Sequence, residues 1–135
     1  MEIRKARPED RGPARRLAES LGLDYPRLDD DPAWVAEEDG RIAGLVARLD
    51  NPDCRELVAL GVDPSFRHHR LGRRLVEALA AETPGDIYLA TIIPGFFEGC
   101  GFVRIPAAPP GMAKDAFWCE GCPKERCTIM VRTPR

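Results

Sequence analysis

The sequence of 135 residues predicts a mixed α/β fold. An almost continuous apolar run at 56–62 ends at Asp63-Pro64, and leucines then recur every fourth residue from Leu71, which is the pattern of a buried strand followed by a helix. Upstream, Asp39-Gly40 separates two more apolar runs, which indicates an antiparallel hairpin. We therefore expect a sheet with a largely antiparallel front half and helices inserted between its strands.

The first elements are a short strand at 3–6 and a helix that begins at Pro8. One face of this helix carries the apolar residues Ala14, Leu17, Ala18 and Leu21. Because Pro13 removes a backbone donor, we expect either that the helix proper starts near Gly12 or that its first turns are irregular. Gly22 ends the helix. Residues 23–32 are expected to form a solvated connection, with a border of a substrate pocket as the alternative.

The later elements are delimited by turn residues. Strands are expected at 33–37, 42–47, 56–62, 87–92, near 102–105 and at 128–132, with a helix after Leu71 and a short one after Pro94. Turns are expected at 51–53, 83–86 and 106–111. Phe96, Phe97 and Phe102 are expected to be core aromatics.

Composition limits the class of protein. An apolar fraction of 44% over 135 residues supports one domain spanning 1–135 with a core of its own. The net charge of −2 argues against nucleic acid as a partner. The charged N-terminus is followed by no apolar segment of membrane-spanning or secretory length, so we expect a cytoplasmic protein with no membrane partner. Five cysteines predict thiols or a metal site rather than disulfides.

A basic cluster lies between the buried strand at 56–62 and the helix that follows it. It contains Arg67, His68, His69, Arg70 and Arg73. The first backbone N–H groups of a helix have no intrahelical partner, and the helix dipole favours an anion there. The cluster therefore predicts a phosphate-binding seat, with a solvated basic turn or a weak nucleic-acid patch as alternatives.

This cluster resembles the pyrophosphate loop of the GNAT family of N-acetyltransferases, whose pattern is Gln/Arg-x-x-Gly-x-Gly/Ala. The register here is Arg67-x-x-Arg70-x-Gly72. Arg70 occupies a glycine position, so a nest of amides requires Arg70 to adopt backbone angles that glycine adopts easily. The stretch 96–102 resembles the second signature of the family, Phe-Tyr-x-x-x-Gly-Phe, with Phe97 in place of the tyrosine.

The resemblance implies the acyl-CoA N-acyltransferase fold, with a mostly antiparallel twisted sheet of about six to seven strands and about four helices. It also implies an acetyl-CoA-dependent N-acetyltransferase that acts on a primary amine of a small molecule through a direct ternary complex. No metal is required for this chemistry. A homodimer is left open.

The resemblance assigns roles to particular residues. Glu56 would be the general base, and Gly61 would form a bulge whose N–H bonds the thioester oxygen. The residues expected to bind the coenzyme are Leu60, Gly61, Val62, Arg67, His68, His69, Arg70, Leu71, Gly72 and Arg73. Because Phe97 cannot donate a proton, the general acid would be Tyr88, Tyr25 or water, unless the thiolate leaves unassisted.

The segment with Cys119, Cys122 and Cys127 resembles the end of the short bacterial acetyltransferases labelled N-acetylglutamate synthases. That resemblance implies an amino acid such as glutamate as acceptor, although Val58 stands where that group has an arginine. The cysteines are interpreted as a reduced structural loop, with a zinc site or a redox role as alternatives. Two further hypotheses are a degenerate acyl-CoA-binding regulatory module and a cysteine-based metal module on the same fold.

Overall fold

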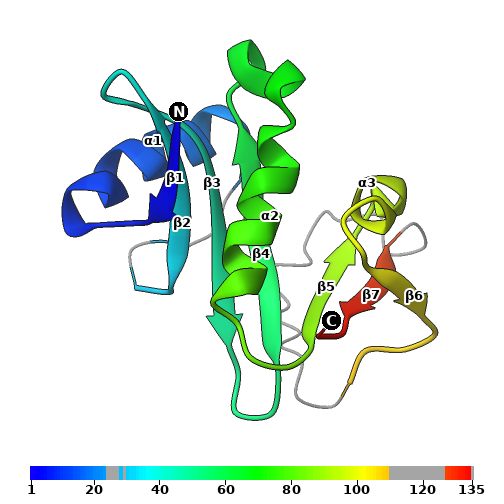
Figure 1. Ribbon diagram of the computed structural model, residues 1–135. Coiled ribbons are helices and arrows are strands. Elements are labelled where there is room, and N and C mark those ends of the chain that lie inside the picture. Colours follow the sequence, from blue (N-terminus) through cyan, green and yellow to red (C-terminus); the bar gives the residue numbers. More distant parts are fainter. Residues whose placement is uncertain (24–27, 29, 110–126, 135) are drawn as a thin grey trace. The chain divides into compact units, whose positions relative to one another are not determined.

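The computed structural model describes residues 1–23, 28, 30–109 and 127–134. Within these residues, seven strands form one sheet in the order β1-β2-β3-β4-β5-β7-β6 (Figure 1). The strands are β1 (Glu2–Lys5), β2 (Ala33–Glu38), β3 (Arg41–Asp50), β4 (Arg55–Val62), β5 (Ile87–Thr91), β6 (Val103–Ile105) and β7 (Thr128–Arg132). The helices are α1 (Arg11–Ser20), α2 (Leu71–Ala81) and α3 (Pro94–Glu98), with 3-10 helices at Pro8–Asp10 and Pro64–His69.

The sheet is mixed, as the sequence predicts. Strand β4 runs parallel to β5, whereas β1–β2, β2–β3, β5–β7 and β6–β7 are antiparallel pairs. Contacts within the chain define two compact units. The first unit is Met1–Leu49 with Leu57–Glu82, and the second unit is Asp50–Glu56 with Thr83–Arg135.

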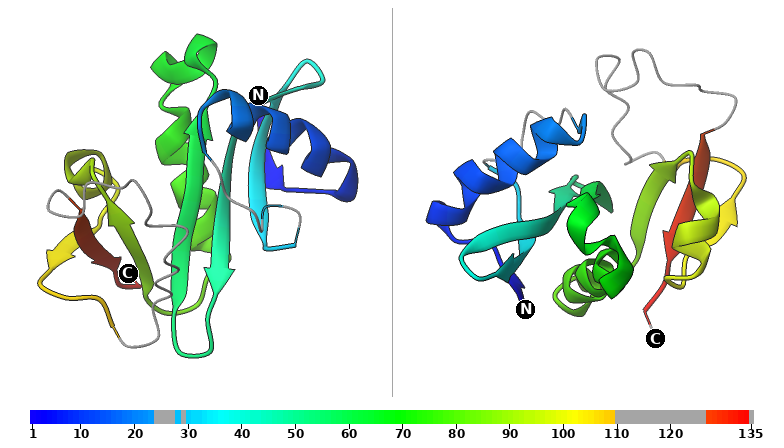
Figure 2. Two further views of the ribbon diagram at one scale, coloured as in Figure 1. Left: turned by 180° about the vertical axis from the view of Figure 1, so that it is seen from behind. Right: turned by 90° about the horizontal axis from the view of Figure 1, so that it is seen from above.

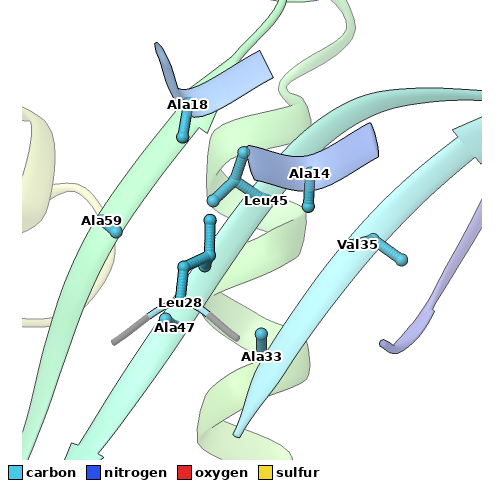
Figure 3. Packing of buried hydrophobic residues seen from close by; sticks show 8 residues of the cluster. All are labelled: Ala14, Ala18, Leu28, Ala33, Val35, Leu45, Ala47 and Ala59. Carbon is cyan, nitrogen blue, oxygen red and sulfur yellow. The ribbon is translucent and has the colours of Figure 1, made fainter. Parts of the chain in front are cut away.

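In the first unit, α1 and α2 cover opposite faces of the strands (Figure 2, right view, α1 in blue and α2 in green). Under α1, Ala14 and Ala18 lie over Leu45 of β3 (Figure 3). The buried cluster on this face comprises Ala14, Ala18, Leu28, Ala33, Val35, Leu45, Ala47 and Ala59. These small and branched side chains let the helix approach the sheet closely.

The start of α1 agrees with both sequence alternatives, since the α-helix proper begins at Arg11, next to Gly12. A 3-10 helix at Pro8–Asp10 precedes α1, so the first turn is irregular. Pro13 is the third residue of α1, where the missing backbone N–H would have no intrahelical partner. Gly22 has φ 74° and ends the helix, as predicted.

The other face of the first unit holds α2. Its residues Leu71, Leu75, Val76 and Leu79 are fully buried. The helix packs closely on β3 at Gly44, because a Cβ there would lie 2.9 Å from Leu75 Cδ1 and 3.2 Å from the Gly61 carbonyl oxygen. At the end of α2, the Trp34 indole N–H donates to the Glu82 carboxylate. The contact at Gly44 holds the middle of α2 against β3, and the Trp34–Glu82 hydrogen bond holds its C-terminal end against β2.

The predicted hairpin is present. Asp39 and Gly40 have φ 49° and 80° and join β2 to β3, which is the pattern of a two-residue turn of type I′.

The prediction that residues 23–32 form a solvated connection is wrong for Leu28 and Asp31, which are 1% and 5% exposed. Leu28 belongs to the buried cluster under α1, and the Arg11 guanidinium donates to the carbonyl oxygens of Leu28 and Asp31 at 2.8 and 2.7 Å. Residues 24–27 and 29 lie outside the described residues.

In the second unit, Phe97 of α3 makes edge-to-face contacts with Phe96 and Phe102, at centroid distances of 5.0 and 5.7 Å. Phe97 and Phe102 are buried, as expected for core aromatics. The same expectation is wrong for Phe96, which is 39% exposed. Phe96 is the third residue of a five-residue helix and lies on the side that faces solvent.

Candidate functional site

The turn after β4 is anchored by Asp63. Its backbone N–H donates to the Ala43 carbonyl of β3 at 2.8 Å, and its carboxylate accepts from the Ser65 N–H at 2.9 Å. Its own carbonyl accepts from the Phe66 N–H at 2.8 Å. The chain therefore leaves the sheet in a fixed direction and enters the 3-10 helix Pro64–His69, whose backbone includes Arg67, His68 and His69.

Arg70 joins this 3-10 helix to α2 in the left-handed conformation, with φ 54° and ψ 31°. A residue with a Cβ pays a conformational cost there that glycine does not. The Arg70 carbonyl accepts the Arg74 N–H at 3.1 Å, so Arg70 is the N-cap of α2, and its side chain makes no capping hydrogen bond. The backbone condition set by the sequence, that this arginine adopt a glycine-like conformation, is met.

The N-terminus of α2 has the charge pattern of an anion site. Its first turn contains no acidic residue, and the side chains of Arg70, Arg73 and Arg74 are exposed. Leu71 is fully buried, so only its backbone can face a ligand, whereas Gly72 is half-buried. The side chains of Arg67, His68 and His69 lie outside the described residues. Backbone donors without a side-chain cap, next to exposed guanidinium groups, fit a diphosphate.

Ala59 has φ 53° within β4, whereas Gly61 is absent from the residues with positive φ. The bulge expected at Gly61 stays a prediction. A Cβ at Gly61 would lie 2.6 Å from Leu23 Cδ1 and 2.9 Å from Leu21 Cδ1, so a side chain there would displace these leucines. A left-handed residue within a strand breaks its regular hydrogen bonding. The neighbouring predicted residues Leu60 and Val62 are half-buried on the same strand.

Glu56 lies near the start of β4, in the second unit. It is 4% exposed, and its Oε2 accepts a hydrogen bond from Asn51 Nδ2 at 3.0 Å. Its partner in the parallel register of β5 is Tyr88, which is half-buried. From the sequence, Asn51 is predicted only to be a turn residue. An amide that precedes a strand with a buried carboxylate near its start is the signal that could have identified it.

Cys54 lies on the same turn. Its thiol is buried, Asn51 Nδ2 lies 3.6 Å from its Sγ, and burial raises its pKa above the ordinary value. Cys54, Cys100 and Cys127 are not joined in disulfides. Cys119 and Cys122 lie outside the described residues, as does Tyr25.

The described part of the chain contains neither a cluster of metal-ligating side chains nor a membrane-spanning helix. No group of three or more histidine, cysteine or acidic side chains in it is arranged to hold a metal ion. Every helix in it is too short or too polar to span a bilayer.

The fold is similar to several solved structures over the whole chain. The Mycobacterium tuberculosis protein Rv2747, solved in complex with CoA and NLQ, has a TM-score of 0.73 at 20% identity, covering 100% of both chains. N-acetylglutamate synthase from Neisseria gonorrhoeae, solved with coenzyme A and N-acetyl-glutamate, has a TM-score of 0.67 at 18% identity over 100% of this chain and 36% of that one. An aminoglycoside 6'-acetyltransferase type Ii has a TM-score of 0.70 at 21% identity, covering 100% and 99% of the two chains.

No curated protein sequence matches the chain. The model of the acetyltransferase (GNAT) family, by contrast, matches residues 2–102. This match covers most of the 135 residues and includes β4, the basic turn, α2 and the phenylalanine signature. The chain belongs to the GNAT family of acetyltransferases.

Proposed function

We propose that residues 1–135 act as one acetyl-CoA-dependent N-acetyltransferase domain, which transfers the acetyl group to a primary amine of a small molecule in a direct ternary complex. The observation that carries this proposal is the left-handed Arg70 at the N-terminus of α2. Solved structures of similar fold that contain coenzyme A support it.

The charges around Arg70 favour ligand binding over helix stability. Acidic residues stabilise the first turn of a helix, whereas Arg70, Arg73 and Arg74 oppose its dipole. A left-handed arginine adds a further cost of about 1 kcal/mol. A bound diphosphate would offset both effects, because it accepts from the first amides of α2 and pairs with the guanidinium groups.

Glu56 is proposed as the general base. An amine with a pKa of about 10 is largely protonated at neutral pH, so it must lose a proton before its lone pair attacks the thioester carbon. Glu56 accepts this proton directly or through a water molecule. Because Glu56 is 4% exposed and its carboxylate is hydrogen-bonded, this group is held in place before the substrate arrives.

The leaving thiolate requires little assistance, and Tyr88 is the proposed donor of its proton. Coenzyme A thiols ionise near pKa 8.5, so a single proton donor or water is sufficient. Phe97 is buried in an aromatic cluster and cannot donate. A backbone N–H released where β4 is irregular at Ala59 is the proposed donor to the developing oxyanion.

The acceptor is proposed to be an amino acid, with glutamate as the first to test. Support comes from the cysteine segment at 119–127 and from the similarity to a structure named as N-acetylglutamate synthase. Val58 is half-buried and apolar, so a carboxylate of the acceptor must find its cation elsewhere. Release of coenzyme A thiol, measured over amino acids, polyamines and aminoglycosides, identifies the class.

Calorimetric binding tests the diphosphate seat. Acetyl-CoA should bind about 100-fold more tightly than acetyl-pantetheine, which lacks the diphosphate, since two or three charge-assisted contacts are lost. Arg73→Gln should reduce this difference, whereas Arg16→Gln, an equal change of charge on an exposed residue of α1, should not. Equal affinities for the two ligands in the wild-type protein would contradict the proposal.

A catalytically inactive acyl-CoA-binding module is the second candidate, favoured by Phe97 in place of the family tyrosine and by its burial. Tight binding of acetyl-CoA with no thiol release over the whole amine panel would support it.

A metal module built on Cys119 and Cys122 predicts stoichiometric zinc in protein purified without chelator. Fractionation of the native cell would test the expected cytoplasmic location. Light scattering would test whether the protein forms a homodimer.

A further inference from the structure

The side-chain amide of Asn51 contacts two groups of the second unit. Its Nδ2 lies 3.0 Å from Glu56 Oε2 and 3.6 Å from Cys54 Sγ. A carboxylate accepts and does not donate, so the nitrogen of the amide, rather than its oxygen, must face Glu56. The two hydrogens of one NH₂ group can serve these two acceptors.

The turn between β3 and β4 fixes this amide in place. The backbone N–H of Asn51 donates to the Cys54 carbonyl at 2.9 Å, across Pro52 and Asp53. Cys54 and Glu56 are two residues apart where the chain enters β4, so their side chains point to the same side. Asn51 therefore approaches Glu56 from a short, closed turn, which leaves its side chain little freedom.

We propose that Asn51 is a positioning residue that holds the Glu56 carboxylate in its reactive orientation and in its charged form. This inference depends on the proposed role of Glu56 as general base. A hydrogen bond donated to a carboxylate stabilises the charged form that accepts the proton. The Cys54 thiol, which shares the Asn51 amide, and Tyr88, the register partner of Glu56 on β5, are the neighbours of this carboxylate on the turn and on the next strand.

Steady-state kinetics over a pH range test the inference with Asn51→Ala and Asn51→Asp. Asn51→Ala should lower kcat about tenfold, the factor equivalent to one hydrogen bond to a charged group, and leave the Kd for acetyl-CoA unchanged. The acid limb of the kcat/KM profile should move to higher pH, because the charged carboxylate has lost a donor. Asn51→Asp should move it further, because two like charges then face each other.

Asp53→Asn is the matched control, since it changes an exposed residue of the same turn and leaves the amide contact intact. It should keep kcat within twofold of the wild type and leave the pH profile unchanged. A similar melting temperature for Asn51→Ala and wild type shows that the loss of rate is not a loss of fold. A shift of the pH profile by Asp53→Asn as large as that by Asn51→Ala would overturn the inference.

A double-mutant cycle separates this inference from the proposed function. If Glu56→Gln leaves kcat unchanged, Glu56 is not the base and both proposals fall. If Glu56→Gln lowers kcat but Asn51→Ala changes neither kcat nor the pH profile, only the role of Asn51 is wrong. If both act through one carboxylate, Asn51→Ala should have little further effect on kcat in the Glu56→Gln background, whereas additive effects contradict the inference.

Discussion

Glu56 lies opposite Tyr88 in the parallel register of β4 and β5. Register partners on neighbouring strands direct their side chains to the same face of a sheet. The proposed base and the half-buried phenol are therefore neighbours across the strands, although they come from separate segments of the sequence.

Removing the Tyr88 hydroxyl should slow turnover. Tyr88→Phe should lower kcat about tenfold and leave the KM for acetyl-CoA unchanged, because the lost group would act on the leaving thiolate and not on the bound nucleotide. Thiol-release kinetics measure both constants. An unchanged kcat would assign the final proton to water.

The left-handed conformation of Arg70 predicts that two substitutions at this position differ in their effect on stability. Arg70→Gly and Arg70→Ala remove the same guanidinium, but only glycine relieves the left-handed strain at φ 54°. Arg70→Gly should therefore be more stable to urea than Arg70→Ala by about 1 kcal/mol. Both should weaken acetyl-CoA binding and reduce its dependence on salt. Equal stability of the two variants would contradict the left-handed assignment.

The close approach of α2 to β3 predicts that Gly44→Ala destabilises the protein. The new methyl group would lie 2.9 Å from Leu75 Cδ1, 3.2 Å from the Gly61 carbonyl oxygen and 3.4 Å from Leu71 Cδ2, so the buried leucine side chains of α2 must move within a packed core. We expect a loss of about 1–3 kcal/mol in the free energy of unfolding. Gly12→Ala on α1 is the control, since its Cβ meets only Arg16 Nη1 at 3.6 Å. It should be neutral or stabilising.

Asp10 predicts a loss of stability in acid. Hydrogen bonds from the Arg4 guanidinium hold the pKa of Asp10 below its ordinary value, supported by the Arg7 N–H at 2.8 Å and opposed by burial. Because the folded pKa is lower than the unfolded value of about 3.9, this stabilisation is complete above that value and is lost as the pH falls through the folded pKa.

Asp10→Asn should therefore lower the free energy of unfolding at pH 7 by about 2–4 kcal/mol and flatten its dependence on pH below about 4. Urea unfolding at a series of pH values measures this. Asp86→Asn, at an exposed position, should change neither quantity. The same acid dependence in Asp10→Asn as in the wild type would show that other carboxylates cause it.

The sequence by itself determined the order of strands and helices, because apolar periodicity and turn residues are local properties of the chain. Asp39-Gly40, the leucines of α2 and the apolar run of β4 each occur where the sequence predicts them. Resemblance to the GNAT signatures identified the family, which the family match confirms. The basic turn and Glu56 were also selected from the sequence, and their roles stay predictions.

Only the tertiary structure decided how individual residues are used. Arg70 adopts a glycine conformation because β4, Asp63 and the buried face of α2 fix both of its ends. A side chain at Gly61 would displace Leu21 and Leu23, a close contact that no local pattern encodes. The turn after β3 brings Asn51 within hydrogen-bonding distance of Glu56, and the register of β4 and β5 pairs Glu56 with Tyr88. These relationships depend on packing between distant segments, and local patterns in a single sequence do not specify such packing.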